Sequence, residues 1–301
     1  MSKSTTILST SSNVVPVRFI LSFGKKVARK LKILRHNIRD YLLMPPHHQF
    51  IVQSLEKQGL QEQSILLAGH PKSGNTWTRF VIFNYFNILL NDADKTLTYV
   101  QLSELQQQVF NDNGIIMRHF MPGFPILVRT HSPYRKVFRY FGRVIFLYRN
   151  PLDVLISLYR VEEKRTGQTV KEIPIDAFVL SRLPGWIWHY TSIINRCDVI
   201  MRYEDMRADA YGEFNRLFHA LGIEVQEHIL RQSLELSSFE NIRRMGRETN
   251  QQYGSHHLYT FKGEFTRSGQ VKQYQGVLKT ETIQACQEML RRQKIEIDLS
   301  I

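Results

Sequence analysis

LLAGHPKSGNTW, residues 66–77, is the stretch of this sequence that says most about its fold. It overlaps the apolar run Ser64–Ala68, which has the length of a short buried strand, and it opens an apolar segment, Asn75–Leu89, that predicts a helix. A strand, a glycine turn and a helix in this order aim backbone N–H groups and the positive end of a helix dipole at one place. The stretch therefore predicts an α/β fold with an anion site at this turn.

Short apolar strands alternate with helical segments along the rest of the chain. Three more strands are predicted at residues 126–130, 143–148 and 199–203, and helices at residues 49–58, 151–162 and 210–221. Strands that alternate with helices form parallel sheets, and ligands lie at the carboxyl ends of such strands. The sequence therefore predicts one three-layer, P-loop-like α/β domain over residues 49–301, with a central, mostly parallel sheet flanked by helices.

The positive charge of the chain is concentrated at its amino terminus. The formal net charge is +13, yet residues 1–39 hold nine Lys and Arg and no Asp or Glu. Taking these nine from the 40 Lys and Arg of the whole chain leaves 31, against 27 Asp and Glu, so the other residues carry a net charge of +4. A mildly basic body suits one small polyanionic ligand and does not require a nucleic-acid partner.

Residues 1–48 form a basic segment that is expected to be partly flexible. Residues 18–43 carry apolar side chains at helical spacing, which predicts a solvated helix packed on the domain. Peripheral membrane contact, or an organelle-targeting role of residues 1–43, stays open. Cys197 and Cys286 lack metal-ligand spacing, and no apolar run approaches the ~20 residues of a membrane span, so a cytoplasmic protein is predicted.

The predicted anion site departs from the nucleotide-triphosphate P-loop in two ways. The glycines and Thr76 have the spacing of that motif, but Asn75 stands where its lysine is expected, and Lys72 lies inside the loop instead. The strand at residues 143–148 is followed by Arg149, where a kinase or NTPase usually has an Asp that holds magnesium. Because an arginine supplies positive charge to an anion directly, the pattern predicts a site that requires no metal.

The segment from Pro71 to Trp77 resembles the 5′-phosphosulfate loop of the cytosolic-type sulfotransferase family and matches its pattern PKSGxTW at every fixed position. The resemblance implies that the chain moves a sulfuryl group from 3′-phosphoadenosine 5′-phosphosulfate (PAPS) to an acceptor hydroxyl or amine. It implies that Lys72 contacts the bridging oxygen of the departing sulfate, where a cation stabilises growing charge, and that Trp77 stacks on adenine. The residues between them are also expected to bind PAPS: Ser73, Gly74, Asn75 and Thr76.

A second segment, Arg149–Ser157, resembles the 3′-phosphate motif of the same family. In that motif an arginine and the serine eight residues later bind the 3′-phosphate, which implies these roles for Arg149 and Ser157. An arginine fork is suited to a dianionic phosphate. Asn150 and Pro151 fit the cap and the first turn of the helix that carries the serine.

Three later segments, MRYEDM, SSF and FTRSG, resemble parts of the family that surround the adenine and the 3′-phosphate. They extend the predicted nucleotide site by Tyr203, Ser237, Phe239, Arg267, Ser268 and Gly269. Ser268 stands where the family has a lysine. The site is therefore expected to lose one cation and some affinity for PAPS, unless Lys272 compensates.

His131 follows the predicted strand at residues 126–130 and is the candidate general base. An imidazole has a pKa near the working pH, as proton abstraction from a hydroxyl requires. The family carries a Lys-Thr-His-x-Pro segment whose histidine is this base, and the present chain has Arg129 in the lysine position. The resemblance therefore implies an in-line displacement at sulfur with His131, Lys72 and Arg129 as catalytic residues.

Two other functions stay open from the sequence alone. One is a P-loop kinase that acts on a small molecule, and the other is a non-enzymatic protein whose basic amino terminus binds acidic membrane or nucleic acid. Variable loops at residues 111–124 and 161–183 are expected to form the acceptor pocket. Aromatic residues there and nearby, Phe120, Phe124 and Trp186, favour a lipophilic or aromatic alcohol as acceptor. The oligomeric state stays open.

Overall fold

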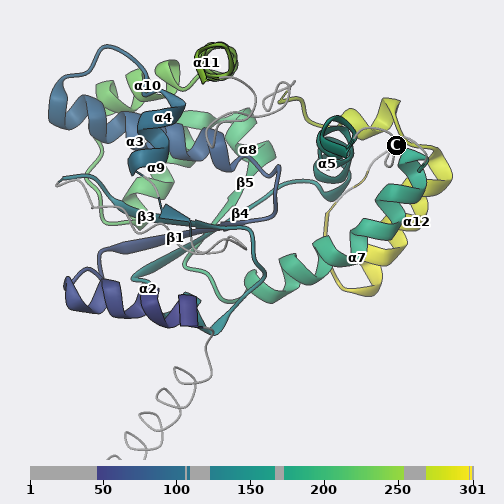
Figure 1. Cartoon of the computed structure of the whole chain (residues 1–301). Helices are drawn as coiled ribbons and strands as arrows, with labels where there is room; N and C mark the ends of the chain where they lie inside the picture. Colours follow the sequence, from purple (N-terminus) through teal and green to yellow (C-terminus); the bar gives the residue numbers. More distant parts are fainter. Residues whose placement is uncertain are drawn as a thin grey trace, which may run out of the picture. The chain divides into compact units, whose positions relative to one another are not determined.

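The computed structural model describes residues 46–105, 107–108, 123–166, 173–253, 269–297 and 299 (Figure 1). Three predictions fall outside these residues: nearly all of the basic segment 1–48, the pair Arg267 and Ser268, and most of the expected loop 111–124. The division of the chain near residue 48 stays a prediction.

The central sheet has five parallel strands in the order β2-β3-β1-β4-β5. Their bounds are β1 Ser64–Gly69, β2 Gln107–Gln108, β3 Ile126–Thr130, β4 Arg143–Tyr148 and β5 Val199–Arg202. β1 pairs with β3 on one side, where Ala68 is opposite Thr130, and with β4 on the other, where Gly69 is opposite Leu147. The ends of β4 and β5 are paired in the same way. The predicted parallel sheet is confirmed, and the carboxyl ends of β3, β1, β4 and β5 lie at one edge.

Helices cover both faces of this sheet and form the predicted three layers (Figure 1). α2 (Pro46–Lys57) lies on one face, and α3 (Asn75–Asn91), α9 (Ala210–Ala220) and α10 (Glu227–Leu236) lie on the other. The shorter or more peripheral elements are α4 (Tyr99–Leu105), α8 (Tyr203–Ala208), α11 (Phe239–Tyr253) and the 3-10 turns η1 (Lys136–Tyr140) and η2 (Gln273–Gly276). None of the helices in the described residues has both the length and the apolar character that crossing a bilayer requires.

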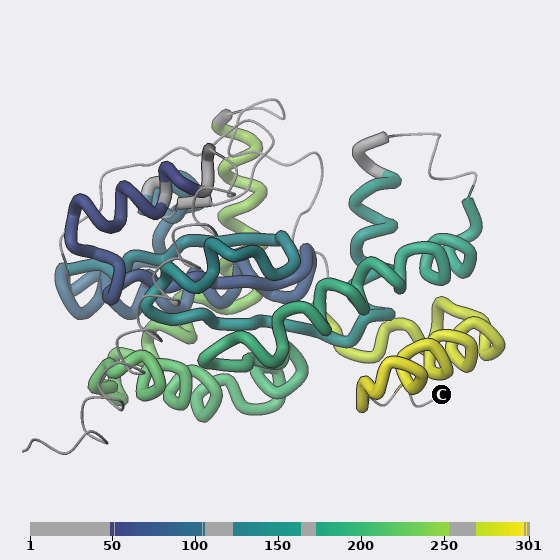
Figure 2. The backbone as a smooth tube through the Cα atoms, turned by 90° about the horizontal axis from the view of Figure 1, so that it is seen from below, coloured from purple at the N-terminus to yellow at the C-terminus, as the bar shows by residue number. Residues whose placement is uncertain are grey.

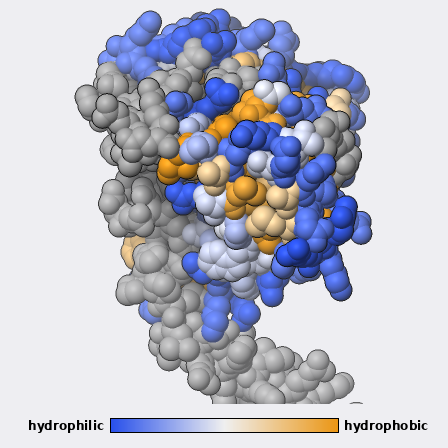
Figure 3. All heavy atoms as spheres, turned by 90° about the vertical axis from the view of Figure 1, so that its right-hand side faces the viewer, coloured by the Kyte–Doolittle hydropathy of each residue, from blue (hydrophilic) through white to orange (hydrophobic). Residues whose placement is uncertain are grey.

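Three further helices, α5 (Pro151–Thr166), α7 (Ile175–Ile193) and α12 (Thr280–Arg292), pack together beside the sheet. Figures 1 and 2 both show α7 and α12 running side by side. Trp186 and Tyr274 are buried in the second apolar cluster that these helices share with η2. Figure 3 looks onto this side of the protein and shows apolar side chains in patches surrounded by hydrophilic ones.

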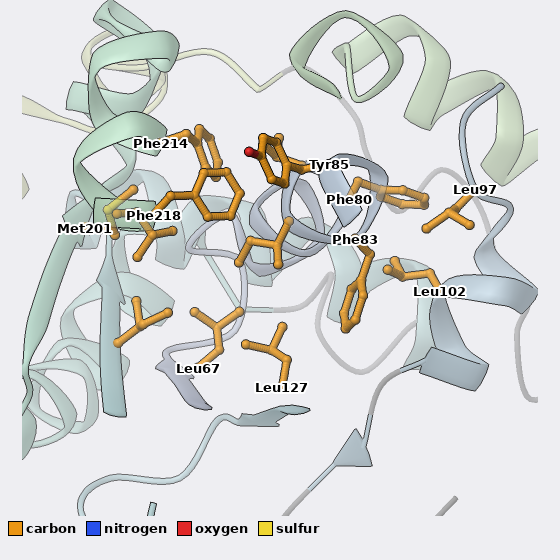
Figure 4. Close-up of a cluster of buried hydrophobic side chains, with 14 of the residues drawn as sticks. Leu67, Phe80, Phe83, Tyr85, Leu97, Leu102, Leu127, Met201, Phe214 and Phe218 are labelled. Carbon is orange, nitrogen blue, oxygen red and sulfur yellow. The ribbon is translucent and has the colours of Figure 1, made fainter. Parts of the chain in front are cut away.

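The main core lies between the sheet and the helices above it (Figure 4). Leu67 of β1 and Leu127 of β3 are buried beneath Phe83 of α3. The ring of Tyr85 packs on Phe218 of α9, with centroids 4.6 Å apart. Since each such side chain stabilises the fold by roughly 2 kcal/mol when buried, this core fixes α3 relative to β1 and hence the turn that joins them.

Two expectations about the acceptor region were wrong. The sequence predicts a variable loop at residues 161–183, but α5 continues to Thr166 and α7 begins at Ile175. α7 contains Pro184 and is apolar on most sides, so it lacks the one-sided pattern that identifies a surface helix. Trp186, expected near the acceptor, is 1% exposed and belongs to the second core cluster.

The turn between β4 and α5 has the predicted cap. Asn150 Oδ1 accepts the N–H of Leu152 at 3.0 Å, and Pro151 is the first residue of the helix. The N–H of Asn150 in turn donates to Glu204 Oε1 at 2.9 Å. These two hydrogen bonds fix the backbone beside Arg149 at the edge of the sheet.

Candidate active site

Four of the predicted site segments meet at the carboxyl edge of the sheet. The glycine loop follows β1, His131 follows β3, Arg149 follows β4 and Tyr203 follows β5. Because the ends of these strands are paired with one another, the four segments lie close together. The fold therefore assembles one site from residues far apart in the sequence.

The loop after β1 packs too closely against its neighbours to carry side chains at its two glycines. Lys72 and Gly74 have left-handed backbones, with φ of 73° and 106°. A Cβ atom on Gly74 would lie 2.7 Å from Cδ2 of Tyr203, and one on Gly69 would lie 2.7 Å from the carbonyl oxygen of Leu147. The loop can therefore lie directly against the ends of β4 and β5. α3 begins directly after this loop. Its first-turn N–H groups, which have no acceptor within the helix, therefore lie at the loop.

Several buried polar atoms around this edge have no hydrogen-bond partner. They are Ser73 Oγ, both polar side-chain atoms of Asn75, Arg129 Nε and Arg149 Nε. Proteins leave few buried polar groups unpaired, and most of these atoms are donors. Within the described part of the chain, no three His, Cys, Asp or Glu side chains are placed to hold a metal ion. A donor-rich, positively charged site fits a ligand with several anionic oxygens, as phosphate and phosphosulfate groups have.

Arg149 links three of the converging segments. Its guanidinium donates to the carbonyl oxygens of Gln270 at 2.6 Å and of Lys72 at 3.4 Å. It lies 4.4 Å from the centre of the Tyr203 ring and pairs with Asp153, at 3.6 Å between Nη2 and Oδ2. These contacts hold the guanidinium at the junction of the loop, the end of β5 and the segment around residue 270.

Asp153 is a residue of this site that the sequence analysis missed. Its buried carboxylate accepts the backbone N–H groups of Lys272 at 2.8 Å and of Tyr274 at 3.3 Å. Burial raises the pKa of this carboxyl group, while the charge of Arg149 and the two backbone donors act in the opposite direction. The contact joins α5 to a segment 119 residues later in the chain. Asp153 therefore anchors the segment that contacts Arg149.

Replacing Asp153 by alanine is expected to lower the free energy of unfolding by about 3 kcal/mol, because it leaves a buried guanidinium without its carboxylate and two backbone N–H groups without acceptors. Urea unfolding followed by circular dichroism measures the loss. Glu248→Ala is a matched control, since its pair with Arg244 is more than half exposed on both sides and is worth less than ~1 kcal/mol. Equal losses in the two variants would contradict the anchoring role.

Aromatic side chains form one wall of the site. Trp77 lies edge-on to Tyr203, with ring centroids 6.1 Å apart, and the guanidinium of Arg207 lies 5.8 Å from the Trp77 ring. Tyr203 donates a hydrogen bond to the carbonyl oxygen of Gly269 at 2.8 Å. A Cβ atom on Gly269 would lie 3.0 Å from Phe239, so this ring borders the same place. Rings beside cations provide stacking surfaces of the kind that a nucleotide base uses.

The other described residues that the sequence predicts for the nucleotide site are Ser157, Thr76 and Ser237, and each has different surroundings. Ser157 is half-buried on α5, two turns into the helix. Thr76, at the start of α3, accepts a long hydrogen bond of 3.5 Å from Arg79. Ser237 is fully buried, and its hydroxyl accepts a hydrogen bond from Asn84 of α3 at 2.9 Å. This bond ties Ser237 to the core through the helix that begins at the loop.

His131 contacts the end of β1 directly. Its Nδ1 lies 2.7 Å from the carbonyl oxygen of Gly69, so Nδ1 carries the proton and Nε2 carries the lone pair. Burial lowers the pKa of His131 to about 3, and the charges of Arg129 and Arg79 add to this effect. The imidazole is therefore neutral at pH 7 and is held in the tautomer that can accept a proton at Nε2.

Two arginines give the site a positive potential. Burial lowers the pKa of the Arg129 guanidinium on β3. Arg79 of α3 donates to the carbonyl oxygen of Asn75 at 3.3 Å, and burial together with the charge of Arg129 holds its pKa well below its usual value. The positive charges of Arg79 and Arg129 repel each other, and an anion bound between or beside them would relieve this repulsion. Arg79 was not predicted from the sequence, because an arginine inside an apolar helix belongs to no motif that would identify it.

Two further histidines near His131 were also missed. The ring of His189, on α7, lies edge-on to the ring of His70, with centroids 5.4 Å apart. Burial, with the charge of His70, lowers the pKa of His189 to about 3, while hydrogen bonds to the backbone of His131 and Ser132 act in the opposite direction. α7 therefore helps to hold the end of β3 that carries His131. The contact depends on how α7 packs, so no local sequence signal predicts it.

Comparison with known sequences places this pattern in one family. The sulfotransferase domain model matches residues 62–297, from just before β1 to just after α12. Flavonol 4′-sulfotransferase of Flaveria chlorifolia is 25% identical over 244 residues, which cover 71% of this chain and 73% of that protein. The amine sulfotransferase of Oryctolagus cuniculus is 24% identical over 211 residues, which cover 64% of this chain and 67% of that protein.

Solved structures of similar proteins share the fold. Retinol dehydratase in complex with androsterone and the inactive cofactor PAP aligns with a TM-score of 0.61 and 18% identity, over 80% of this chain and 83% of that one. A mouse sulfotransferase complexed with PAP aligns with a TM-score of 0.57 and 20% identity, over 79% and 86% of the two chains. At these identities the likeness establishes the α/β architecture.

Proposed function

Since the chain belongs to the sulfotransferase domain family, we propose that it moves a sulfuryl group from PAPS to a small-molecule hydroxyl or amine, with His131 as the general base. Because it belongs to this family, the chain is a sulfotransferase. The kinase and the non-enzymatic protein, which the sequence left open, are therefore set aside. The observation that carries the base assignment is the 2.7 Å contact between His131 Nδ1 and the Gly69 carbonyl oxygen. This contact holds the ring against the loop and leaves Nε2 as the proton acceptor.

In this proposal the nucleotide binds along the carboxyl edge of the sheet. Arg149 and Ser157 bind the 3′-phosphate, and the unpaired groups of Ser73 and Asn75, with the backbone N–H groups at Gly74 and Thr76, bind the 5′-phosphosulfate. The adenine is bordered by Trp77, Tyr203 and Phe239. The contacts of Tyr203 with both Arg149 and Gly269 support this arrangement, because they join the base pocket to the phosphate pocket. Arg267 and Ser268 stay predictions.

The transfer forms one bond to sulfur and breaks another. The acceptor oxygen bonds to sulfur while its proton passes to Nε2 of His131. The bond between sulfur and the bridging oxygen breaks, and its electron pair stays on the 5′-phosphate oxygen. Lys72 and Arg129, with the loop N–H groups, stabilise the charge on the leaving and equatorial oxygens. Because a sulfuryl group carries less charge than a terminal phosphoryl group, cationic side chains suffice for this purpose.

Binding of the sulfate donor is expected to raise the pKa of His131 from its value in the free site. In the free site, burial and the charge of Arg129 lower this pKa to about 3. The negative charge of a phosphosulfate group near the arginine offsets its repulsion of the imidazolium form. His131 therefore becomes a stronger proton acceptor when the donor is in place.

We infer a lipophilic or aromatic alcohol as the acceptor and a cytoplasmic location. One structurally similar protein, retinol dehydratase, was solved with androsterone and with retinol, and both of these ligands are alcohols. Cys197 and Cys286 are free thiols, which is consistent with a reducing compartment. Peripheral membrane contact or organelle targeting through the basic residues 1–43 stays the alternative, and nearly all of that segment lies outside the described residues.

Transfer of labelled sulfate from PAPS to a panel of alcohols, phenols and amines tests the proposed function. We expect labelled product with at least one class, first among lipophilic or aromatic alcohols, and the same rate in EDTA as in magnesium. The same panel incubated with labelled ATP and magnesium is the control and is expected to give no product. Label that stays on the nucleotide with every acceptor would contradict the proposal.

A further inference from the structure

A cleft beside the predicted nucleotide site is lined by cations to which the proposed mechanism gives no role. It encloses about 870 Å³ between α5, α8 and residues 269–277. Arg160, Arg207 and Lys272 line it. Gly269, which borders Tyr203 and Phe239, lines it as well, whereas the histidine and lysine proposed for catalysis do not. The cleft therefore adjoins the nucleotide end of the site rather than the reacting end.

Arg160 is a half-buried cation in this cleft whose Nε atom is buried and makes no hydrogen bond. The one carboxylate among the described lining residues, Glu204, is engaged elsewhere. It accepts the N–H of Asn150 at 2.9 Å and pairs with Arg202 at 3.2 Å. Because a partly buried guanidinium without a counter-ion costs free energy, the cleft favours an anionic ligand at Arg160.

The position of Arg160 on α5 indicates which anion it meets. Asp153, Ser157 and Arg160 stand at i, i+4 and i+7 and therefore lie along one face of the helix. Asp153 holds the backbone of Lys272 against this face, with a hydrogen bond of 2.8 Å. Arg160 consequently lies one turn beyond Ser157, on the face where residues 269–277 close the cleft.

We propose that Arg160 binds the 3′-phosphate of the nucleotide together with Ser157 and Arg149. This inference rests on the proposed function, which places the 3′-phosphate at those two residues. A guanidinium presents a planar fork of donors that matches two phosphate oxygens. Arg160 thereby supplies, from α5, the cation that is lost where Ser268 stands in the place of a lysine. It adds to the preference of the site for nucleotides that carry a 3′-phosphate.

A two-by-two comparison of protein and ligand isolates this contact. Calorimetry gives the Kd of 3′-phosphoadenosine 5′-phosphate, and of adenosine 5′-monophosphate, which lacks only the 3′-phosphate, for the wild type and for Arg160→Gln. Arg160→Gln is expected to weaken binding of the 3′-phosphorylated nucleotide by roughly 10- to 100-fold, the range of a charged hydrogen bond. The Kd of adenosine 5′-monophosphate is expected to change by less than about twofold, since it cannot make the contact.

Two further variants complete the design. Arg182→Gln is the matched control, because this arginine of α7 pairs with Glu162 at 3.9 Å and does not line the cleft; both Kd values are expected to stay unchanged. Arg160→Lys keeps the positive charge without the planar fork of guanidinium donors, and it is expected to retain part of the preference for the 3′-phosphorylated nucleotide. Thermal melting verifies that each variant is folded. If the wild type prefers the 3′-phosphorylated nucleotide and the Arg160→Gln variant shows the same preference, the role of Arg160 is overturned and the proposed function is not affected. A folded wild type that binds neither nucleotide overturns the proposed function as well.

Discussion

Lys72→Ala is expected to lower kcat for sulfuryl transfer by about 100- to 1,000-fold, whereas the Kd of intact PAPS should change by less than about tenfold. The proposed contact of the ammonium group is with the bridging oxygen, whose negative charge grows as its bond to sulfur breaks. An interaction that strengthens in the transition state affects kcat more than it affects binding of the donor. Steady-state rates at saturating acceptor, with equilibrium binding of PAPS in the absence of acceptor, measure the two effects separately.

The matched control for this variant is Lys95→Ala, an exposed lysine outside the site, which should leave both quantities unchanged. Lys72 has a left-handed backbone with φ of 73°, and alanine tolerates that conformation about as well as lysine does, so the loop should keep its shape. Lys72→Arg keeps the charge but shifts it, and is expected to recover only part of the rate. A Lys72→Ala enzyme with kcat within about threefold of the wild type would contradict the assignment.

His131→Asn is expected to lower kcat by about 100- to 10,000-fold, the range attributed to a positioned general base. The asparagine amide can donate to the Gly69 carbonyl oxygen in place of Nδ1–H, so the contact that holds the end of β3 against β1 is kept. The amide has no nitrogen that accepts a proton, so only the chemical step is lost. Binding of PAPS should be nearly unchanged.

A series of phenols with decreasing pKa gives this second prediction a readout that a purely structural role would not produce. The loss of rate in His131→Asn should shrink as the acceptor becomes more acidic, because an acceptor that is already ionised needs no base. His219→Asn, at an exposed position near the end of α9, is the control and should behave as the wild type. A loss of the same size for every phenol would show that His131 acts in some other way.

The parts of the fold that the sequence predicted are those encoded in contiguous residues. The strand, glycine loop and helix around residues 64–91 are local, because an apolar run, two glycines and an apolar helix follow one another directly. The cap at Asn150 is local for the same reason, and so is the arginine that follows β4. α7 was mistaken for a loop in part, since apolar side chains such as Trp188 lie on its exposed side as well as on its buried face, and this removes the amphipathic pattern on which the prediction depends.

What the sequence could not supply is contact between distant segments. Asp153 holds the backbone of Lys272 from 119 positions away, and Ser237 bonds to Asn84 from 153 positions away. The contact of His189 with the end of β3 depends on the packing of α7, and the proximity of Arg79 to Arg129 depends on the pairing of β3 with β1. These contacts follow from strand order and helix packing, which a single sequence does not encode in any one stretch.

The central claim is that cationic side chains and backbone donors at the carboxyl edge of the sheet bind an adenine nucleotide with a 3′- and a 5′-phosphate without a metal. Isothermal titration of 3′-phosphoadenosine 5′-phosphate into the full chain, in the presence of EDTA, tests this most directly. We expect saturable binding at one site per chain, with a Kd that magnesium does not improve. A correctly folded protein that takes up no nucleotide, or takes it up only when magnesium is added, would contradict it.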